Sequence, residues 1–383
     1  MRFNGNVVLQ DLKIKKELKV KLESSLSEAE IREALLDGHA KRRPRPCGLT
    51  IHTSTGCSYG CLYCYIFDMG FSQRPEPYKL SSSQLVYALI SNESFVVGRH
   101  GTLLAFGSVT EPFMPIAKRK TMEYLKATSS HLGNPQQISV KGVLEPQELE
   151  DFTASAETDI DVLISLTTFN KAKQLEPRAP SPTARLDFAM ELIKRKVSVA
   201  LFVRPILPSV TDREFDLILE GAEKRGVKRL VLGTLRLTKL ILKRLETSRA
   251  IDIEELRSRT PLGFEKSQKQ IALRASDIKK RLQAEANSRG FKVYPAACAS
   301  SIDAHKLYCR LCGMGPCGEK SEAVKVDEEG IKDAAETLRA NVAVNVCNDV
   351  IDIICLSNWK ACDKLKLYIE TVAKVRTRVR RQK

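Results

Sequence analysis

Residues 56–65 read Gly-Cys-Ser-Tyr-Gly-Cys-Leu-Tyr-Cys-Tyr, a stretch that spaces Cys57, Cys61 and Cys64 as CxxxCxxC. A β-rich run over 49–53 precedes it, so we expect these cysteines in a loop that follows a strand. Two glycines suit a short loop around a metal cluster, because its backbone takes unusual φ and ψ angles close to the inorganic sulfides. The stretch therefore predicts a metal-binding loop at the carboxyl end of a strand.

Three thiolates on a four-iron four-sulfur cluster leave one iron without a protein ligand. That iron can be chelated by the amino and carboxylate groups of an amino-acid-like cofactor, which holds a sulfonium beside the cluster so that one electron breaks its C–S bond. The alternative interpretations are a structural zinc site, which prefers four ligands, and cysteines that are simply buried.

Short β-rich runs alternate with helical periods on either side of this loop. The expected strands cover 49–53, 102–106, 138–140, 161–167, 197–203 and 229–232, and the expected helices cover 81–91, 115–129, 146–156, 182–195 and 213–225. Repeated βα units give a parallel sheet, which opens as a doubly wound fold or curls into a barrel. We predict an α/β fold with a partial or complete parallel (βα) barrel and functional residues at the carboxyl ends of its strands.

The chain divides into three parts by pattern. Residues 1–45 read as an N-terminal extension with a helix over 27–36 capped by Ser27, and 46–240 form the core. Residues 241–383 form a C-terminal region that we expect to be Cys-rich and mainly helical. Within it, 235–290 look helical from just before the boundary, 291–294 could add a strand, and 335–375 are expected to be helices.

The cysteine spacing, with the aromatic Tyr63 just before the third cysteine, resembles the signature of the radical SAM superfamily. The similarity runs from about residue 48 to about 245 and is closest to the branch of spore photoproduct lyase and its DNA repair photolyase-like relatives. The segments that carry it are 107–112, 139–141, 175–178, 181–182, 185–186 and 204–208. The resemblance implies a barrel of the radical SAM type. It further implies an enzyme that reductively cleaves S-adenosylmethionine (SAM) at a four-iron four-sulfur cluster and abstracts hydrogen from a substrate.

The resemblance also implies a set of cofactor contacts. Thr110 and Glu111 match positions that contact the SAM amino group, and further matching positions reach the ribose or carboxylate: Lys141, Ser165 and Arg185. Arg185 lies in the first turn of a helix, where the helix dipole disfavours a cation, so an anionic partner would explain it. Ile206, with Pro205 and Leu207, is expected to form the apolar side of an adenine pocket, with core packing as the alternative.

One position departs from the photoproduct lyase pattern. The middle residue of 108–110 is a cysteine in that enzyme, where it returns a hydrogen atom to the product radical, but it is Val109 here. Valine has no comparably weak bond to hydrogen, so we expect a different reaction.

A second group of cysteines, with ten, two and four residues between successive members, comprises Cys298, Cys309, Cys312 and Cys317. Four cysteines can close a metal site, and we predict a second iron-sulfur cluster there, with structural zinc as the alternative. His305 could replace one ligand or be exposed.

The remaining cysteines are assigned differently. For Cys347, Cys355 and Cys362, spaced seven and eight apart, a helix would place all three on one face. They could form a third cluster, but buried thiols or one disulfide are favoured. Cys47 is interpreted as structural.

The formal net charge of +16 favours polyanions. Its basic segments lie at 13–21, 41–45 and 374–383, and the alternative to nucleic-acid binding is a solvated surface with a frayed tail. No apolar run of membrane-spanning length is present, and we expect a cytoplasmic protein that takes electrons from a reductant protein. We expect a nucleic-acid substrate, through RNA modification or DNA lesion repair. The alternatives are a small molecule, peptide or lipid substrate, and a non-catalytic iron-sulfur or zinc binding module.

Overall fold

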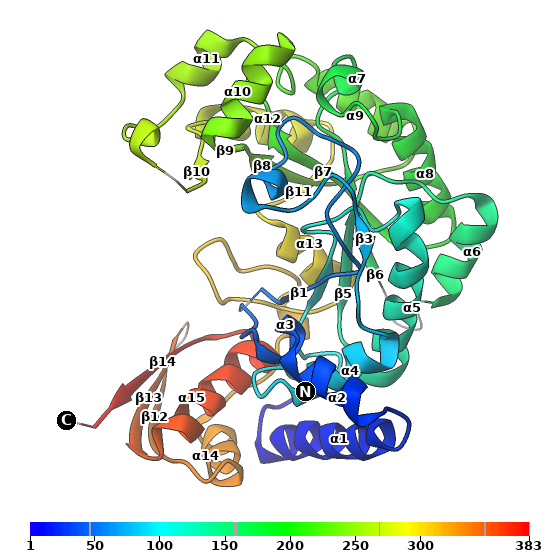
Figure 1. Ribbon diagram of the computed structural model, residues 1–383. Helices are drawn as coiled ribbons and strands as arrows, with labels where there is room; N and C mark the ends of the chain where they lie inside the picture. The colour runs from blue at the N-terminus through cyan, green and yellow to red at the C-terminus, as the bar shows by residue number, and fades with distance from the viewer. Residues whose placement is uncertain (46, 156–159, 268, 348–349, 383) are drawn as a thin grey trace.

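A curved parallel sheet of seven strands forms the centre of the molecule in the computed structural model, which describes residues 1–45, 47–155, 160–267, 269–347 and 350–382 (Figure 1). The strands follow one another in space as they do in sequence. They are β1 (Leu49–Ile51), β4 (Leu104–Phe106), β5 (Gln136–Val140), β6 (Ile160–Ser165), β7 (Ser198–Ile206), β8 (Arg229–Thr234) and β11 (Lys292–Tyr294). The expected strands are confirmed, including the one at 291–294, which completes the sheet from beyond the predicted core boundary at 240.

The connecting helices lie on the convex side of this sheet (Figure 1). Sequential order with right-handed crossovers places every connection on the same face. These helices are α4 (Ser82–Ser91), α5 (Pro115–Leu132), α6 (Pro146–Ser155), α8 (Pro182–Lys194), α9 (Phe215–Glu223) and α12 (Ser276–Ser288). Since β1 and β11 are the two ends of the strand order in the described residues, the predicted (βα) barrel is a partial one.

The two faces of the sheet bury different partners, as the alternation of side chains along a strand requires. Val162 and Ile164 pack with the helices of the convex side. Leu163, Ala200 and Val231 point to the concave side, where they pack against Ala299 of helix α13 (Ala297–Ala304). This C-terminal helix therefore fills part of the barrel interior and leaves the space nearer the carboxyl ends of the strands for a site.

The N-cap residues predicted from the sequence begin the observed helices. Ser181 caps α8 by accepting from the backbone N–H of Ala184, and Ser27 forms a capping box at the start of α2 (Glu28–Leu36). The helical character expected over 235–290 is confirmed by α10 (Lys239–Ser248), α11 (Ile253–Ser258) and α12, with β9 (Arg236–Leu237) and β10 (Ile271–Ala272) pairing between them. The first helix, α1 (Gly5–Glu23), was not expected, because its long polar run carries only a narrow apolar stripe.

The C-terminal region is mixed, and the helices expected over 335–375 are found only in part. A three-stranded sheet occupies this region, with β12 (Asn341–Cys347) antiparallel to β13 (Val350–Ser357), and β13 parallel to β14 (Arg376–Arg381). Helices α14 (Glu328–Thr337) and α15 (Trp359–Tyr368) cover one face of it (Figure 1). The three late cysteines do not share a helix face: Cys347 is exposed on β12, while Cys355 and Cys362 form a disulfide, the pairing that the sequence left open.

The two ends of the chain share one apolar core. Phe3 and Val8 of the N-terminal segment pack with Ile331 of α14 and with Ile351 and Ile353 of β13. Helix α1 therefore belongs structurally with the C-terminal sheet. In the parts of the chain that the structure describes, no helix is both long enough and apolar enough to cross a membrane.

Candidate functional site

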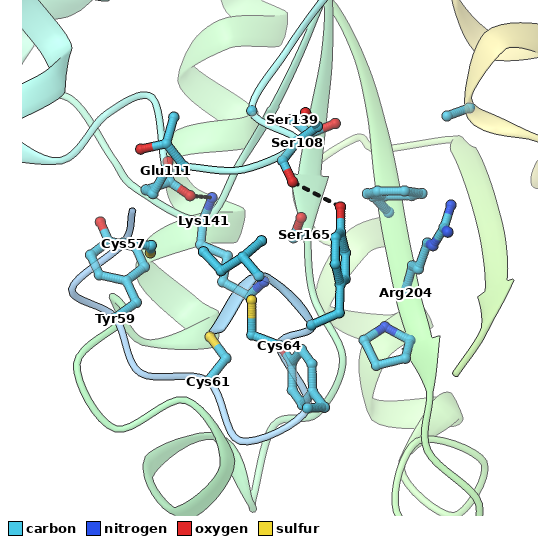
Figure 2. A pocket seen from close by; sticks show the side chains of 18 of the residues that line it. Cys57, Tyr59, Cys61, Cys64, Ser108, Glu111, Ser139, Lys141, Ser165 and Arg204 are labelled. Atoms are coloured by element: carbon cyan, nitrogen blue, oxygen red, sulfur yellow. Dashed lines mark hydrogen bonds between the residues drawn. The ribbon is translucent and has the colours of Figure 1, made fainter. Parts of the chain in front are cut away.

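A cavity of about 340 Å³ lies inside the barrel, near the carboxyl ends of the strands, which is a common size for a small-molecule site. Its wall takes side chains from successive strand ends, among them Ser139, Ser165 and Thr234. Ala297, at the start of α13, lines it from the opposite side. All three cysteines of the 56–65 loop line the same cavity (Figure 2).

The cysteine loop is shaped by its glycines. Gly56 has a φ of +83°, and a Cβ placed there would lie 2.4 Å from the carbonyl oxygen of Ser72. The loop lies between β2 (Ser54–Thr55) and β3 (Glu76–Pro77), which pair antiparallel. Only glycine therefore fits at this turn, and the sequence had suggested that the glycines of this loop take unusual backbone angles.

The three thiols are largely buried. Burial raises the pKa of Cys57 to about 11, and burial also raises the pKa of Cys61 and of Cys64. Such thiols stay protonated at neutral pH by themselves, whereas a bound metal deprotonates a coordinating thiol outright. Over the described residues, no three or more His, Cys, Asp or Glu side chains lie close enough together to hold a single metal ion.

Lys141 brings a positive charge to the cysteines. Its side chain runs from the neighbourhood of Glu111 toward the thiols (Figure 2), and its Nζ lies 5.5 Å from the centre of the Tyr63 ring. The charge of Lys141 acts to lower the pKa of each of the three thiols against the effect of burial. A cation at this position favours an anionic thiolate centre.

Thr110 and Glu111, the residues expected to contact the SAM amino group, both line the cavity. The Glu111 carboxylate accepts from the backbone N–H of Lys141 at 2.7 Å and of Phe113 at 3.3 Å, while burial raises its pKa. The hydroxyl of Thr110 is buried and has no hydrogen-bond partner in the described structure. A buried polar atom without a partner costs free energy, which a ligand in the cavity would recover by bonding to it.

Arg185 has an anionic partner, as its position in the first turn of a helix suggested. That partner is a carboxylate of the protein and not a cofactor. Its guanidinium lies 2.5 Å from the carboxylate of Glu176, and both side chains are almost fully buried. Glu176 also accepts from the hydroxyl of Tyr63 and lies 4.0 Å from Lys141 Nζ. Arg185 is absent from the lining of the cavity, so it supports Tyr63 and Lys141 through Glu176.

The residues expected to form the apolar side of the adenine pocket do not all line the cavity. Pro205 lines the cavity, whereas Ile206 and Leu207 do not and are completely buried in the apolar core. Ile206 and Leu207 are therefore core residues, which was the alternative interpretation of this segment.

Two arginines that were not predicted from the sequence line the cavity: Arg204 on β7 and Arg236 on β9. Burial and the nearby charge of Arg236 lower the pKa of Arg204. Neither forms an ion pair within the described residues. Arg204 lies in segment 204–208, one of the segments that carry the family resemblance, but no role was assigned to it from the sequence.

The second group of cysteines gathers around a fifth thiol. Cys309 and Cys317 pair through backbone hydrogen bonds of 2.9 Å in both directions. The Cys298 thiol lies close enough to Cys47 to lower the pKa of Cys47, and the charges of Cys309 and Cys317 act on the pKa of Cys298. Cys47, interpreted from sequence as merely structural, thus belongs to this group.

Both expectations for His305 are wrong. Its side chain is buried, Nδ1 lies 2.8 Å from the carbonyl oxygen of Ser301, and Nε2 accepts from the backbone N–H of Gln136 at 3.2 Å. These contacts occupy both ring nitrogens, so His305 is neither exposed nor available as a ligand.

Comparisons with known proteins agree with this fold. No family model matches the chain. An uncharacterised protein of Methanocaldococcus jannaschii is 25% identical over 174 residues, which are 43% of this chain and 62% of that protein, less than two thirds of its length.

Solved structures extend the comparison. A spore photoproduct lyase double mutant with bound AdoMet and dinucleoside spore photoproduct has a TM-score of 0.52 at 15% identity, over 64% of this chain and 75% of that one. Another mutant of the same enzyme has a TM-score of 0.53 at 15% identity, over 66% and 78% of the two chains. The core of this chain therefore has the same fold as spore photoproduct lyase.

Proposed function

We propose that this chain is a radical SAM enzyme in which Cys57, Cys61 and Cys64 hold a four-iron four-sulfur cluster and the cavity binds SAM. The observation that carries the proposal is that these three thiols share one cavity with Thr110, whose buried hydroxyl has no partner. When bound, the cluster would supply the electron that splits SAM into methionine and a deoxyadenosyl radical able to take a hydrogen atom from the substrate.

The residues of the chain have separate tasks in this proposal. Glu111, held by backbone N–H groups, presents its carboxylate to the SAM amino group, and Lys141 offsets the negative charge of the thiolates. Tyr63 is fixed by Glu176, and Ser165 lies on the wall toward the ribose. Enclosure of the site by the barrel and α13 protects a radical from water.

The direct test is anaerobic reconstitution with iron and sulfide, reduction, and assay for 5′-deoxyadenosine after SAM is added. We expect deoxyadenosine and methionine to form in the wild type. If the wild type cleaves no SAM and retains zinc instead of iron, the chain is a zinc-stabilised binding module and the proposal is wrong.

Thr110→Val should weaken SAM binding by about 5- to 10-fold, because valine keeps the shape but removes a hydrogen bond worth roughly 1 kcal/mol. Calorimetric titration of SAM into the reconstituted, unreduced protein measures the effect. The matched control is Thr153→Val in α6, whose hydroxyl bonds only to backbone carbonyls of its own helix. Equal SAM affinity in Thr110→Val and wild type would contradict the assigned contact.

We also propose a substrate that carries phosphate, a nucleic acid in particular. Arg204 and Arg236 support this choice, since both line the cavity without a carboxylate partner among the described residues. A small molecule, peptide or lipid is the competing substrate, and it predicts no nucleic-acid binding at physiological salt. The same proposal includes an external electron donor and a cytoplasmic location.

A second iron-sulfur cluster at Cys298, Cys309, Cys312 and Cys317, with Cys47 as a further candidate ligand, is part of the proposal. Zinc is the competing occupant. Cys312→Ala should lower the iron content of the reconstituted protein by about four atoms per chain, from about eight. Iron and zinc analysis measures this, with Cys347→Ala, an exposed cysteine on β12, as control. Unchanged iron, or zinc that persists in the wild type, would contradict the second cluster.

A further inference from the structure

The last strand of the chain presents a row of arginines on the open face of the C-terminal sheet. Side chains alternate across a strand, so Arg376, Arg378 and Arg380 of β14 share one face. They are exposed, whereas Thr377, which points the other way, is buried against the core. The sequence had left open a frayed basic tail, but this segment is a strand paired with β13 in a fixed register.

The charges of these arginines are unpaired. Within the described part of the chain, none of the three forms an ion pair, and Asp352, opposite Arg378 in the register, does not bond to it. Some other surface cations are paired, since Arg119 faces Glu123 and Lys194 faces Glu191 on their own helices. An unpaired row projects a stronger field than the same number of neutralised cations.

The face has a geometry that suits one kind of anion. Alternate residues of a strand lie about 6.6–6.8 Å apart, so the guanidinium groups form a regular line. Beside this line, β13 contributes apolar side chains: Val350 stands opposite Arg376, and Ile354, 43% exposed, stands opposite Arg380. The helices α14 and α15 cover the other face, and the C-terminal sheet lies at one end of the molecule (Figure 1).

We propose that this face binds a single-stranded nucleic acid, with phosphates along Arg376, Arg378 and Arg380 and bases over Val350 and Ile354. A duplex keeps its bases stacked inside and could use only the arginines, whereas a single strand can lay unpaired bases on the apolar flank. Binding here requires neither the cluster nor SAM, so this surface can be tested separately from the proposed enzyme activity.

The test compares the wild type with the triple variant Arg376→Gln, Arg378→Gln, Arg380→Gln in binding a fluorescent, mixed-sequence RNA single strand, followed by anisotropy over a range of salt concentrations. Each lost phosphate contact lowers the slope of log affinity against log salt by about 0.7 for single strands. The triple variant should therefore lose about 2 in slope and about 100-fold in affinity at ~0.1 M salt.

The matched control carries the same change in net charge at paired cations, Arg119→Gln, Lys194→Gln and Lys224→Gln. It should bind RNA nearly as the wild type does. An equal loss in both triple variants, or equal wild-type affinity for single strand and duplex, would overturn the proposal. If the triple variant at β14 unfolds, Arg378→Gln alone should still reduce the slope by about 0.7 and affinity by about 5-fold at ~0.1 M salt.

Discussion

Replacing Cys61 with alanine is expected to reduce deoxyadenosine formation from SAM by at least about 1,000-fold, equivalent to roughly 4 kcal/mol of lost barrier reduction. Cys61 is the most deeply buried of the three thiols that line the cavity, and the charge of Lys141 favours its thiolate. A cluster that loses one of three protein ligands does not retain the open iron on which SAM would be held. The measurement is deoxyadenosine released per chain after anaerobic reduction.

Two controls separate chemistry from folding. Cys347→Ala removes an exposed cysteine from β12 and should leave SAM cleavage unchanged. Circular dichroism should show the same helix content in Cys61→Ala as in the wild type, because alanine replaces only a small buried side chain. Cleavage of SAM by Cys61→Ala at the wild-type rate would remove the first cysteine group from its assigned role.

Replacing Arg185 with methionine should destabilise the fold by about 3–5 kcal/mol, the usual cost of leaving a buried charge without its partner. The side chains of Arg185 and Glu176 are 1% and 0% exposed. Arg257→Met is the matched control, because Arg257 pairs with Glu246 at the surface and such pairs contribute at most about 1 kcal/mol. Thermal or urea unfolding of the three proteins measures the difference.

The same variant should acquire a pH dependence of known sign. Burial raises the pKa of Glu176, and Arg185 opposes that rise, so removing Arg185 raises the pKa further. The folded variant then binds a proton that the unfolded chain has released, and its stability falls as pH rises above the usual carboxyl range. Adding Glu176→Gln to Arg185→Met should remove this dependence and recover part of the stability. A loss below 1 kcal/mol for Arg185→Met at neutral pH would mean that Glu176 is already neutral in the wild type.

The local features of this protein were readable from its sequence. The spacing of Cys57, Cys61 and Cys64 after a strand predicted a loop that the structure places at the cavity, because three residues within one loop need no long-range information to meet. The alternation of strands and helices could also be predicted. Each element buries one face, and the spacing of its apolar residues shows the period of that element. Ser181 capping α8 is a prediction of the same local kind.

The error at the C-terminal sheet was also local. Residues 341–347 alternate valine with polar or small residues, a period of two that indicates a strand, but the cysteine spacing of seven and eight was read as helical. That spacing is compatible with one helix, but the cysteines lie on different elements. Cys355 is on a strand, and Cys362 is on the helix that follows.

Other features were decided by tertiary structure alone. Cys47 meets Cys298, Arg185 meets Glu176, and Arg204 and Arg236 line the same cavity because the strand order and register bring these segments together. The periodicity of a segment states which of its faces is buried, but not which distant segment buries it. The sequence by itself determined the cysteine loop, the caps and the alternating elements, whereas only the folded sheet decided which charges and thiols became neighbours.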